Sequence, residues 1–122
     1  MADDGAERVL ICRVGDERVA LPVSAVRQVV ASASVTRIPG APPAVRGLAN
    51  VHGTLVTALS APHLLGHATP TQSPWLVVLA LYQGRVGLEV DEVEDVHVGS
   101  AGARLLALDA LVRPLIAASS EL

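Results

Sequence analysis

Apolar and polar residues alternate in several short runs along the chain, which is the pattern of half-buried β-strands. A run from Arg8 to Val14 is followed by Gly15-Asp16 and by a second run from Arg18 to Val23. Because Gly and Asp favour tight turns, this stretch predicts a β-hairpin. Ser24 then offers an N-cap for a short helix. The apolar residues with helical spacing there are Ala25, Val26, Val29 and Val30.

Prolines and glycines concentrate in a central stretch from Val35 to Gly53. Proline fixes φ and removes an amide donor, so residues 39–43 cannot lie inside a helix or a central strand, and they predict a rigid turn. The spacing of Val45, Leu48 and Val51 predicts a short helical turn that runs into a strand. An exposed apolar turn of this kind suits protein binding better than catalysis.

The next segment alternates again and contains one helix signal. Thr54 to Leu59 predicts a strand, and Ser60 with Pro62 predicts the start of a helix that Gly66 ends. The polar loop at 67–74 is where we expect mobility or tolerated insertion.

A second hairpin is predicted near Gln83-Gly84, between runs at 75–82 and 85–90. The chain then continues as a strand through Val93 and Val98, whose intervening acids predict a solvent-exposed face. Those acids are Glu89, Asp91, Glu92, Glu94 and Asp95.

The C-terminal part predicts a loop at 99–102 and a strand at 104–112 that turns into a short helix before Pro114. Residues 1–7 are expected to be disordered and residues 117–122 frayed, which leaves one domain at 8–116. Many short strands at close spacing predict a mainly-β, barrel-like domain with short helices.

Composition narrows the classes of function. All nine basic residues are arginine and the net charge is −3, so the chain has no basic field for nucleic acid. Cys12 lies in an apolar run, which predicts a buried small residue. The start of the chain lacks an export signal, and the apolar run at 75–82 is too short for membrane insertion, so we expect a cytoplasmic protein.

Candidate catalytic and metal-binding residues are few. His63 and His67 are four residues apart, but Gly66 interrupts the helix and no acid or cysteine lies nearby in sequence. His97 follows two acids and is expected to be a surface histidine. The chain has no phosphate-binding loop, nucleophile elbow or calcium loop. We therefore expect no cofactor, no metal and no enzymatic activity.

Several of these segments resemble the CheW-like family, the adaptor domains that couple bacterial chemoreceptors to the chemotaxis histidine kinase. The opening segment resembles the family's strand, Gly-Asp turn and A-L-P-V strand, and the central stretch resembles its I-P-x-x-P-x-x-V-x-G-L-x-N signature. The matching segments are VLICRVGDERVALPVSAVRQVV, VTRIPGAPPAVRGLANVHGTLV, LSAPHLLG and RVGLEVDEVEDV.

The resemblance implies a fold, a function and partners. The fold would be a CheW-like pair of small, SH3-like β-barrels packed together. The function would be that of a non-catalytic adaptor in a chemosensory array, with the chemoreceptor cytoplasmic domain and the kinase regulatory domain as partners. The resemblance also implies a receptor-binding groove in the central stretch. Its residues would be Val35, Ile38, Val45 and Gly47, with Arg37, Asn50 and His52 as a polar rim.

Three departures from the family pattern stand out. His52 replaces an arginine that helps the family bind receptor, and Ala58 and Ser60 replace proline and aspartate. Only five residues, GSAGA, separate Val98 from Arg104, where the family has a longer loop and a further strand. The second barrel is therefore expected to be shortened, as in accessory adaptors such as the Frz-type of gliding bacteria, and kinase binding is expected to be weak.

Two other classes of function stay open. The first is a small β-barrel binding module for another ligand such as an oligonucleotide, which the scarcity of aromatic residues and the negative charge disfavour. The second is an enzyme with an unrecognised site, which the lack of a nucleophile–base or metal cluster disfavours.

Overall fold

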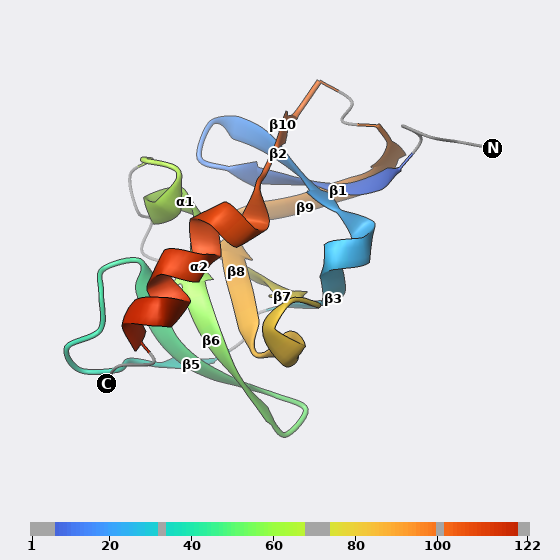
Figure 1. Ribbon diagram of the computed structural model, residues 1–122. Coiled ribbons are helices and arrows are strands. Elements are labelled where there is room, and N and C mark those ends of the chain that lie inside the picture. Colours follow the sequence, from blue (N-terminus) through green and yellow to red (C-terminus); the bar gives the residue numbers. More distant parts are fainter. Residues whose placement is uncertain (1–6, 32–33, 68–73, 100–101, 120–122) are drawn as a thin grey trace.

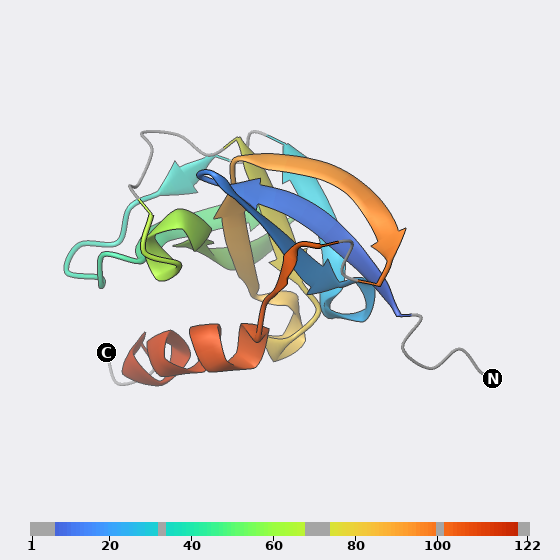
Figure 2. The same cartoon turned by 90° about the horizontal axis from the view of Figure 1, so that it is seen from above.

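The computed structural model describes residues 7–31, 34–67, 74–99 and 102–119, which form two β-sheets and short helices (Figures 1 and 2). The four-stranded sheet, in the order β10-β2-β1-β9, contains β1 (Arg8–Val14), β2 (Glu17–Pro22), β9 (Glu92–Val98) and β10 (Arg104–Leu105). The six-stranded sheet, in the order β3-β7-β8-β6-β5-β4, contains β3 (Val26–Ala31), β4 (Val35–Thr36), β5 (Val45–Val51), β6 (Thr54–Ser60), β7 (Trp75–Leu79) and β8 (Val86–Val90). The helices are η1 (Val23–Ala25), α1 (Ala61–Leu64), η2 (Tyr82–Gly84) and α2 (Leu108–Ser119). The prediction of a mainly-β fold with short helices is confirmed.

The largest hydrophobic core joins the two sheets. Leu10, Cys12 and Val14, on one face of β1, pack in a cluster with apolar residues of β7, β8 and α2. The hairpins β1–β2 and β7–β8 are antiparallel, as predicted. Cys12 is fully buried, and burial raises the pKa of its thiol to about 12. The prediction that Cys12 is a buried core residue is confirmed.

The helix predicted after Ser24 is wrong, because only η1 is helical and Val26–Ala31 is the strand β3. This strand pairs with β7 in antiparallel register. The side chains of Val26, Gln28 and Val30 are half-buried and the alternate ones are exposed, so the burial period is two. The valines of this segment are β-branched and pack well on a pleated surface, and the pairing with β7 overrides their helical spacing.

The helical turn predicted at the start of β5 is also wrong. Val45–Val51 is a strand throughout and pairs with β6, with a bulge between Val45 and Gly47. The strand predicted at 54–59 is confirmed as β6. His52 (φ 51°) and Gly53 (φ 87°) form the two-residue turn between β5 and β6. Positive φ at both positions is the requirement of a type I′ hairpin turn.

The helix predicted at Ser60 is confirmed as α1. Ser60 Oγ accepts a hydrogen bond from the His63 N–H at 3.2 Å, and Pro62 lies in the first turn. Gly66, with φ 82°, follows the helix end. Residues 68–73 of the predicted mobile loop lie outside the described residues.

The strand predicted at 104–112 is wrong beyond Leu105, because β10 has only two residues and α2 begins at Leu108 and continues through Pro114 to Ser119. Leu108 and Val112 on α2 are buried in the main core, so packing offsets the hydrogen bond that proline removes. The helix lies across β6 and β8 on one side of the molecule (Figures 1 and 2). The termini predicted to be loose lie largely outside the described residues.

The shortened segment before Arg104 follows β9, which is an edge strand of the four-stranded sheet. Val96 and Val98 on this edge are exposed. The edge is modified in two ways: a register shift interrupts the β1–β9 pairing, and Asp95 Oδ1 accepts a hydrogen bond from the Val96 N–H at 2.7 Å. Such features protect an open sheet edge from pairing with other chains. The five-residue link leads to β10, which adds only two residues beside β2.

Candidate partner-binding surfaces

Residues 35–46 enclose a hollow of about 500 Å³, which we call the proline groove. Its wall is fixed by two turns, closed by the Ala41 N–H to Ile38 oxygen bond at 3.2 Å and the Val45 N–H to Pro42 oxygen bond at 2.9 Å. Proline restricts the unbound backbone, so little ordering entropy would be lost on binding. The residues lining the groove are Val35, Arg37, Ile38, Pro39, Gly40, Ala41, Pro42, Pro43, Val45 and Arg46. The turn predicted at 39–43 is confirmed.

Arg46 connects the proline groove to the interior of the six-stranded sheet. Its Nε lies 3.0 Å from Oε1 of Glu89, and Glu89 is only 7% exposed. Burial raises the pKa of the Glu89 carboxyl, and the attraction of Arg46 opposes this rise only in part. Glu89 was predicted to lie on a solvent face, which is wrong, because β8 is buried along its whole length between β6 and β7.

Replacing Glu89 with glutamine tests whether this buried carboxylate lowers stability at neutral pH. The pKa of Glu89 is raised in the folded chain, so folding favours the protonated carboxyl and this protonation stabilises the fold. The stabilisation is lost as pH rises through the folded pKa of Glu89. Glutamine resembles the protonated acid but does not titrate. We expect the free energy of unfolding of the wild type, minus that of Glu89→Gln, to decrease between about pH 4 and pH 7. Chemical denaturation measures it, and a constant or increasing difference contradicts the burial effect.

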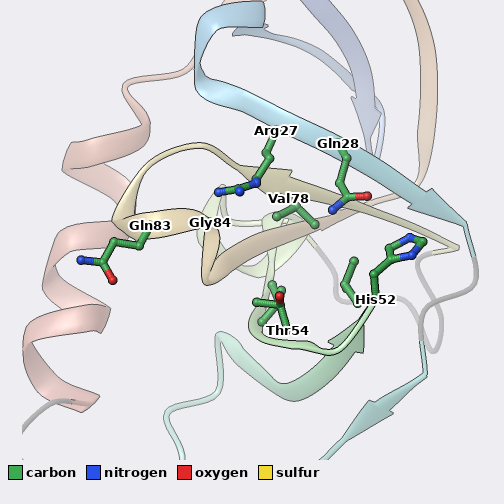
Figure 3. Close-up of a pocket in the computed structure, with 9 residues that line it drawn as sticks. Arg27, Gln28, His52, Thr54, Val78, Gln83 and Gly84 are labelled. Atoms are coloured by element: carbon green, nitrogen blue, oxygen red, sulfur yellow. The ribbon is translucent and has the colours of Figure 1, made fainter.

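A second hollow of about 160 Å³, the His52 cavity, lies at the far end of β5 (Figure 3). It is formed by β3, the β5–β6 turn, β7 and η2. Two of its side chains, Arg27 and His52, carry or can gain positive charge, so the cavity suits an acidic group of a partner. The lining residues are Arg27, Gln28, Val51, His52, Thr54, Val56, Val78, Gln83 and Gly84.

The structure divides the predicted receptor-binding residues between several places. Four of them line the proline groove: Val35, Arg37, Ile38 and Val45. Gly47 is buried, and a Cβ added there would lie 2.1 Å from the Thr36 backbone oxygen, so it permits β4 to approach β5. The Asn50 side chain accepts a hydrogen bond from the Gly53 N–H at 2.9 Å and supports the turn. His52 lines the other cavity, roughly 20 Å from Val45 along β5 at the usual rise of a strand.

Sequence reasoning missed Arg27, Gln28, Gln83 and Gly84 of the His52 cavity. The first two were assigned to a helix, because the apolar residues Ala25, Val26, Val29 and Val30 have helical spacing. Gln83 and Gly84 were assigned only a turn role, which they also have.

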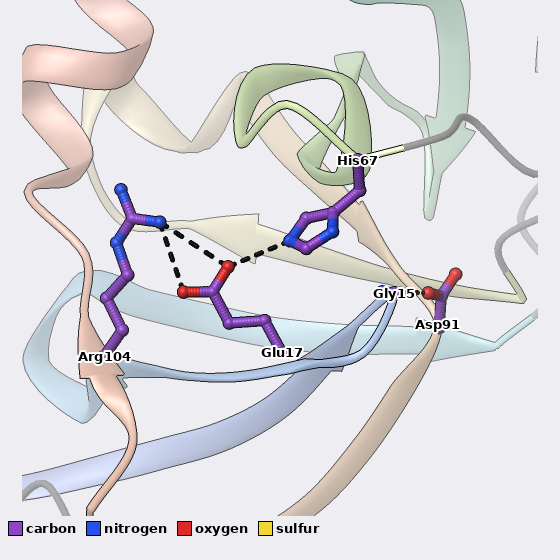
Figure 4. A network of polar contacts seen from close by, with 5 residues as sticks. All are labelled: Gly15, Glu17, His67, Asp91 and Arg104. Carbon is purple, nitrogen blue, oxygen red and sulfur yellow. Dashed lines mark hydrogen bonds and ion pairs between the residues drawn. The ribbon is translucent and has the colours of Figure 1, made fainter.

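A polar network connects the four-stranded sheet to the segment that follows α1, near His67 (Figure 4). His67 Nε2 lies 2.9 Å from Glu17 Oε1, and Arg104 Nη1 lies 3.1 Å from Glu17 Oε2. The hydrogen bond from His67, followed by the charge and hydrogen bond of Arg104, lowers the pKa of Glu17. Asp91 Oδ2 accepts a hydrogen bond from the Gly15 N–H at 2.6 Å and fixes the first hairpin turn.

The histidines considered as metal ligands do not form a metal site in the described part of the chain. His67 is engaged with Glu17, while His63 is exposed on α1. No group of three potential ligands occurs among the described residues. Among the same residues, no helix is long and apolar enough to cross a membrane.

The mainly-β module thus carries two hollows, one walled by prolines and one lined by arginine and histidine. Residues 8–122 match the family described as the CheW-like domain. The chain therefore belongs to the CheW-like family, as its sequence motifs predicted.

Two curated proteins and one solved structure are similar to the chain. "Chemotaxis protein CheW" of Rhizobium meliloti is 30% identical over 95 residues, which cover 76% of this chain and 61% of that protein. "Probable chemotaxis protein CheW" of Rhizobium etli is 25% identical over 122 residues, which cover 98% and 74%. The crystal structure of the scaffolding protein TtCheW from Thermoanaerobacter tengcongensis matches with a TM-score of 0.72 and 20% identity, covering 79% of this chain and 67% of that one. It confirms the CheW-like fold.

Proposed function

We propose that the chain is a non-catalytic, cytoplasmic adaptor in a bacterial chemosensory array, and that it binds the cytoplasmic tip of a chemoreceptor. Membership of the CheW-like family supports the class of function. The observation that carries the proposal is the proline groove, which is preformed, partly apolar and opens to the surface. The match to the R. meliloti relative spans 61% of that protein's length, so its partners are transferred here only as a proposal.

The proline groove would hold an apolar helix of the receptor tip. Val35, Ile38 and Val45 offer apolar contact, and Arg37 offers a charge for an acidic residue of the partner. His52 would make a second, polar contact at the other end of β5. A helix of about 13 residues spans 20 Å, so one receptor helix is long enough to reach both hollows.

Replacing Ile38 with glutamate tests the groove. A carboxylate in an apolar contact would lose its hydration without a partner, so we expect receptor affinity to fall at least roughly tenfold. The matched control is Leu105→Glu, because Leu105 is 58% exposed on β10 of the four-stranded sheet and lines neither hollow. Calorimetry with a purified receptor cytoplasmic domain measures both. The proposal fails if both folded variants bind like the wild type.

His52 provides a pH test of the second contact. If its ring faces an acidic group of the receptor, affinity should rise as the solution is acidified, because only the protonated ring carries a charge that attracts the acidic group. The His52→Arg variant should bind at the low-pH affinity throughout, whereas the exposed control His63→Arg should keep the pH dependence. An unchanged affinity and pH profile in His52→Arg would mean that His52 serves only the turn.

Oligonucleotide binding, the alternative class, finds no support in the described surface. Trp75 and Tyr82 both pack against the main core instead of forming a stacking platform.

A further inference from the structure

The η2 turn, which forms one wall of the His52 cavity, has an unusual backbone. Tyr82, Gln83 and Gly84 have φ values of 55°, 62° and 72°, so three consecutive residues adopt the left-handed conformation. Non-glycine residues rarely do so, and this conformation persists only where surrounding contacts hold it. Contacts from outside the turn must therefore fix η2.

One such contact comes from the C-terminal helix. Tyr82 Oη donates a hydrogen bond to Asp109 Oδ1, in the first turn of α2, and Arg113 Nη2 lies 2.6 Å from Asp109 Oδ2. The ring of Tyr82 packs against the main core. The pKa of Asp109 is lowered, first by the hydrogen bond from Tyr82 and then by Arg113, which agrees with a carboxylate held between two donors.

On its other side, η2 contacts a charged residue of the cavity. A Cβ added to Gly84 would lie 2.5 Å from Arg27 Nη1, so the guanidinium of Arg27 rests directly on the Gly84 backbone. Figure 3 shows η2 with Arg27 above Gly84 and with Gln83 directed toward α2. Contacts therefore run without interruption from Asp109 of α2, through Tyr82 and Gly84, to Arg27.

We propose that Tyr82 is a positioning residue: its hydrogen bond to Asp109 ties η2 to α2 and thereby sets the position of Arg27 in the His52 cavity. The C-terminal helix then controls the shape of this binding surface without touching the partner. The expected effect of the Tyr82–Asp109 hydrogen bond on receptor affinity rests on the proposed function, whereas its expected effect on the position of Arg27 does not. The Tyr82 hydroxyl also interacts with Arg113, which itself pairs with Asp109, so both polar contacts of the hydroxyl lead to α2.

The direct test is Tyr82→Phe, which keeps the ring and removes the hydroxyl. We expect shifted NMR signals and faster hydrogen exchange at the Gly84 amide, together with shifted signals of the Arg27 side chain. We also expect receptor affinity to fall roughly 3- to 10-fold, the usual size of coupling through a contact network. The control is Arg104→Gln, which breaks the ion pair with Glu17 far from the cavity and should change neither readout.

A double-mutant cycle with Asp109→Ala separates this role from general stability. If the two residues act through one bond, the double variant should bind no more weakly than either single variant. Unchanged Gly84 and Arg27 signals in Tyr82→Phe would overturn the proposal, as would an equal loss of affinity in Arg104→Gln. If Tyr82→Phe shifts these signals while the wild type binds no receptor, the positioning role stays intact and the proposed function is contradicted.

Discussion

Replacing Gly47 with alanine is expected to lower the free energy of unfolding by roughly 2–4 kcal/mol, the sum of backbone strain and overpacking. The φ of Gly47 is 146°, and the added Cβ would lie 2.1 Å from the Thr36 oxygen and 2.9 Å from Val35 Cγ1. Because the clash is with backbone, β4 would have to move away from β5. The proline groove, whose wall includes Val35, would lose its shape.

Gly53→Ala is the matched control for this prediction. Gly53 also has a positive φ, 87°, but an added Cβ has no neighbour within 4 Å, so only about 1 kcal/mol of strain is expected. Chemical denaturation of the two variants measures the difference. A Gly47→Ala variant no less stable than Gly53→Ala would contradict the close approach of β4. For the same reason, a bulky residue at Gly47 cannot probe receptor binding.

The second prediction is that the chain binds the kinase regulatory domain at least roughly tenfold more weakly than it binds receptor, about 1.4 kcal/mol. The CheW-like resemblance implies that this domain docks barrel to barrel, and only five residues link β9 to β10 where the family has a further strand. Interfaces of standard size bury only about 800 Å² per partner, so the loss of one strand removes a large share. The proposed receptor surface, formed by the proline groove and the His52 cavity on the six-stranded sheet, does not involve this segment.

The described surface of the four-stranded sheet agrees with this view. Its edge strand β9 is modified by the Asp95 hydrogen bond, and ion pairs cross its face from Arg13 to Glu92 and from Arg18 to Glu94. Exposed pairs of this kind favour contact with water over an apolar interface. Calorimetry with the purified kinase regulatory domain measures its affinity for comparison with that of the receptor. Equal affinities would contradict the prediction and would show that β10 and α2 restore the contact with the kinase. The Frz-type assignment stays a prediction.

The sequence predicted the elements whose signals are local. The turn at Gly15-Asp16, the cap at Ser60 and the prolines at 39–43 act within a few residues, so each could be assigned correctly. The family motifs then supplied the arrangement of the strands, which no local pattern contains.

The errors arose where a distant strand decides the structure. Val26–Ala31 carries a helical spacing of valines, yet β7 pairs with it and makes it a strand. Glu89 looks like one acid among several, yet β6 and β7 flank its strand and bury it against Arg46. Burial by remote segments cannot be deduced from the spacing of neighbouring residues.

The candidate site could be predicted only in part for the same reason. The proline groove is made by consecutive residues and was found, whereas the His52 cavity joins β3, the β5–β6 turn and η2. Placing Arg27 opposite His52 requires the order of strands in the six-stranded sheet.

Binding of the wild-type chain to purified chemoreceptor cytoplasmic domains from its own organism tests the central claim most directly. A pull-down with the whole set of receptors and the chemotaxis kinase, followed by calorimetry on each retained protein, is the measurement. We predict that at least one receptor is retained and that it binds saturably at one site per chain. Retention of neither receptor nor kinase, while an unrelated partner is captured reproducibly, would contradict the assignment as a chemoreceptor adaptor.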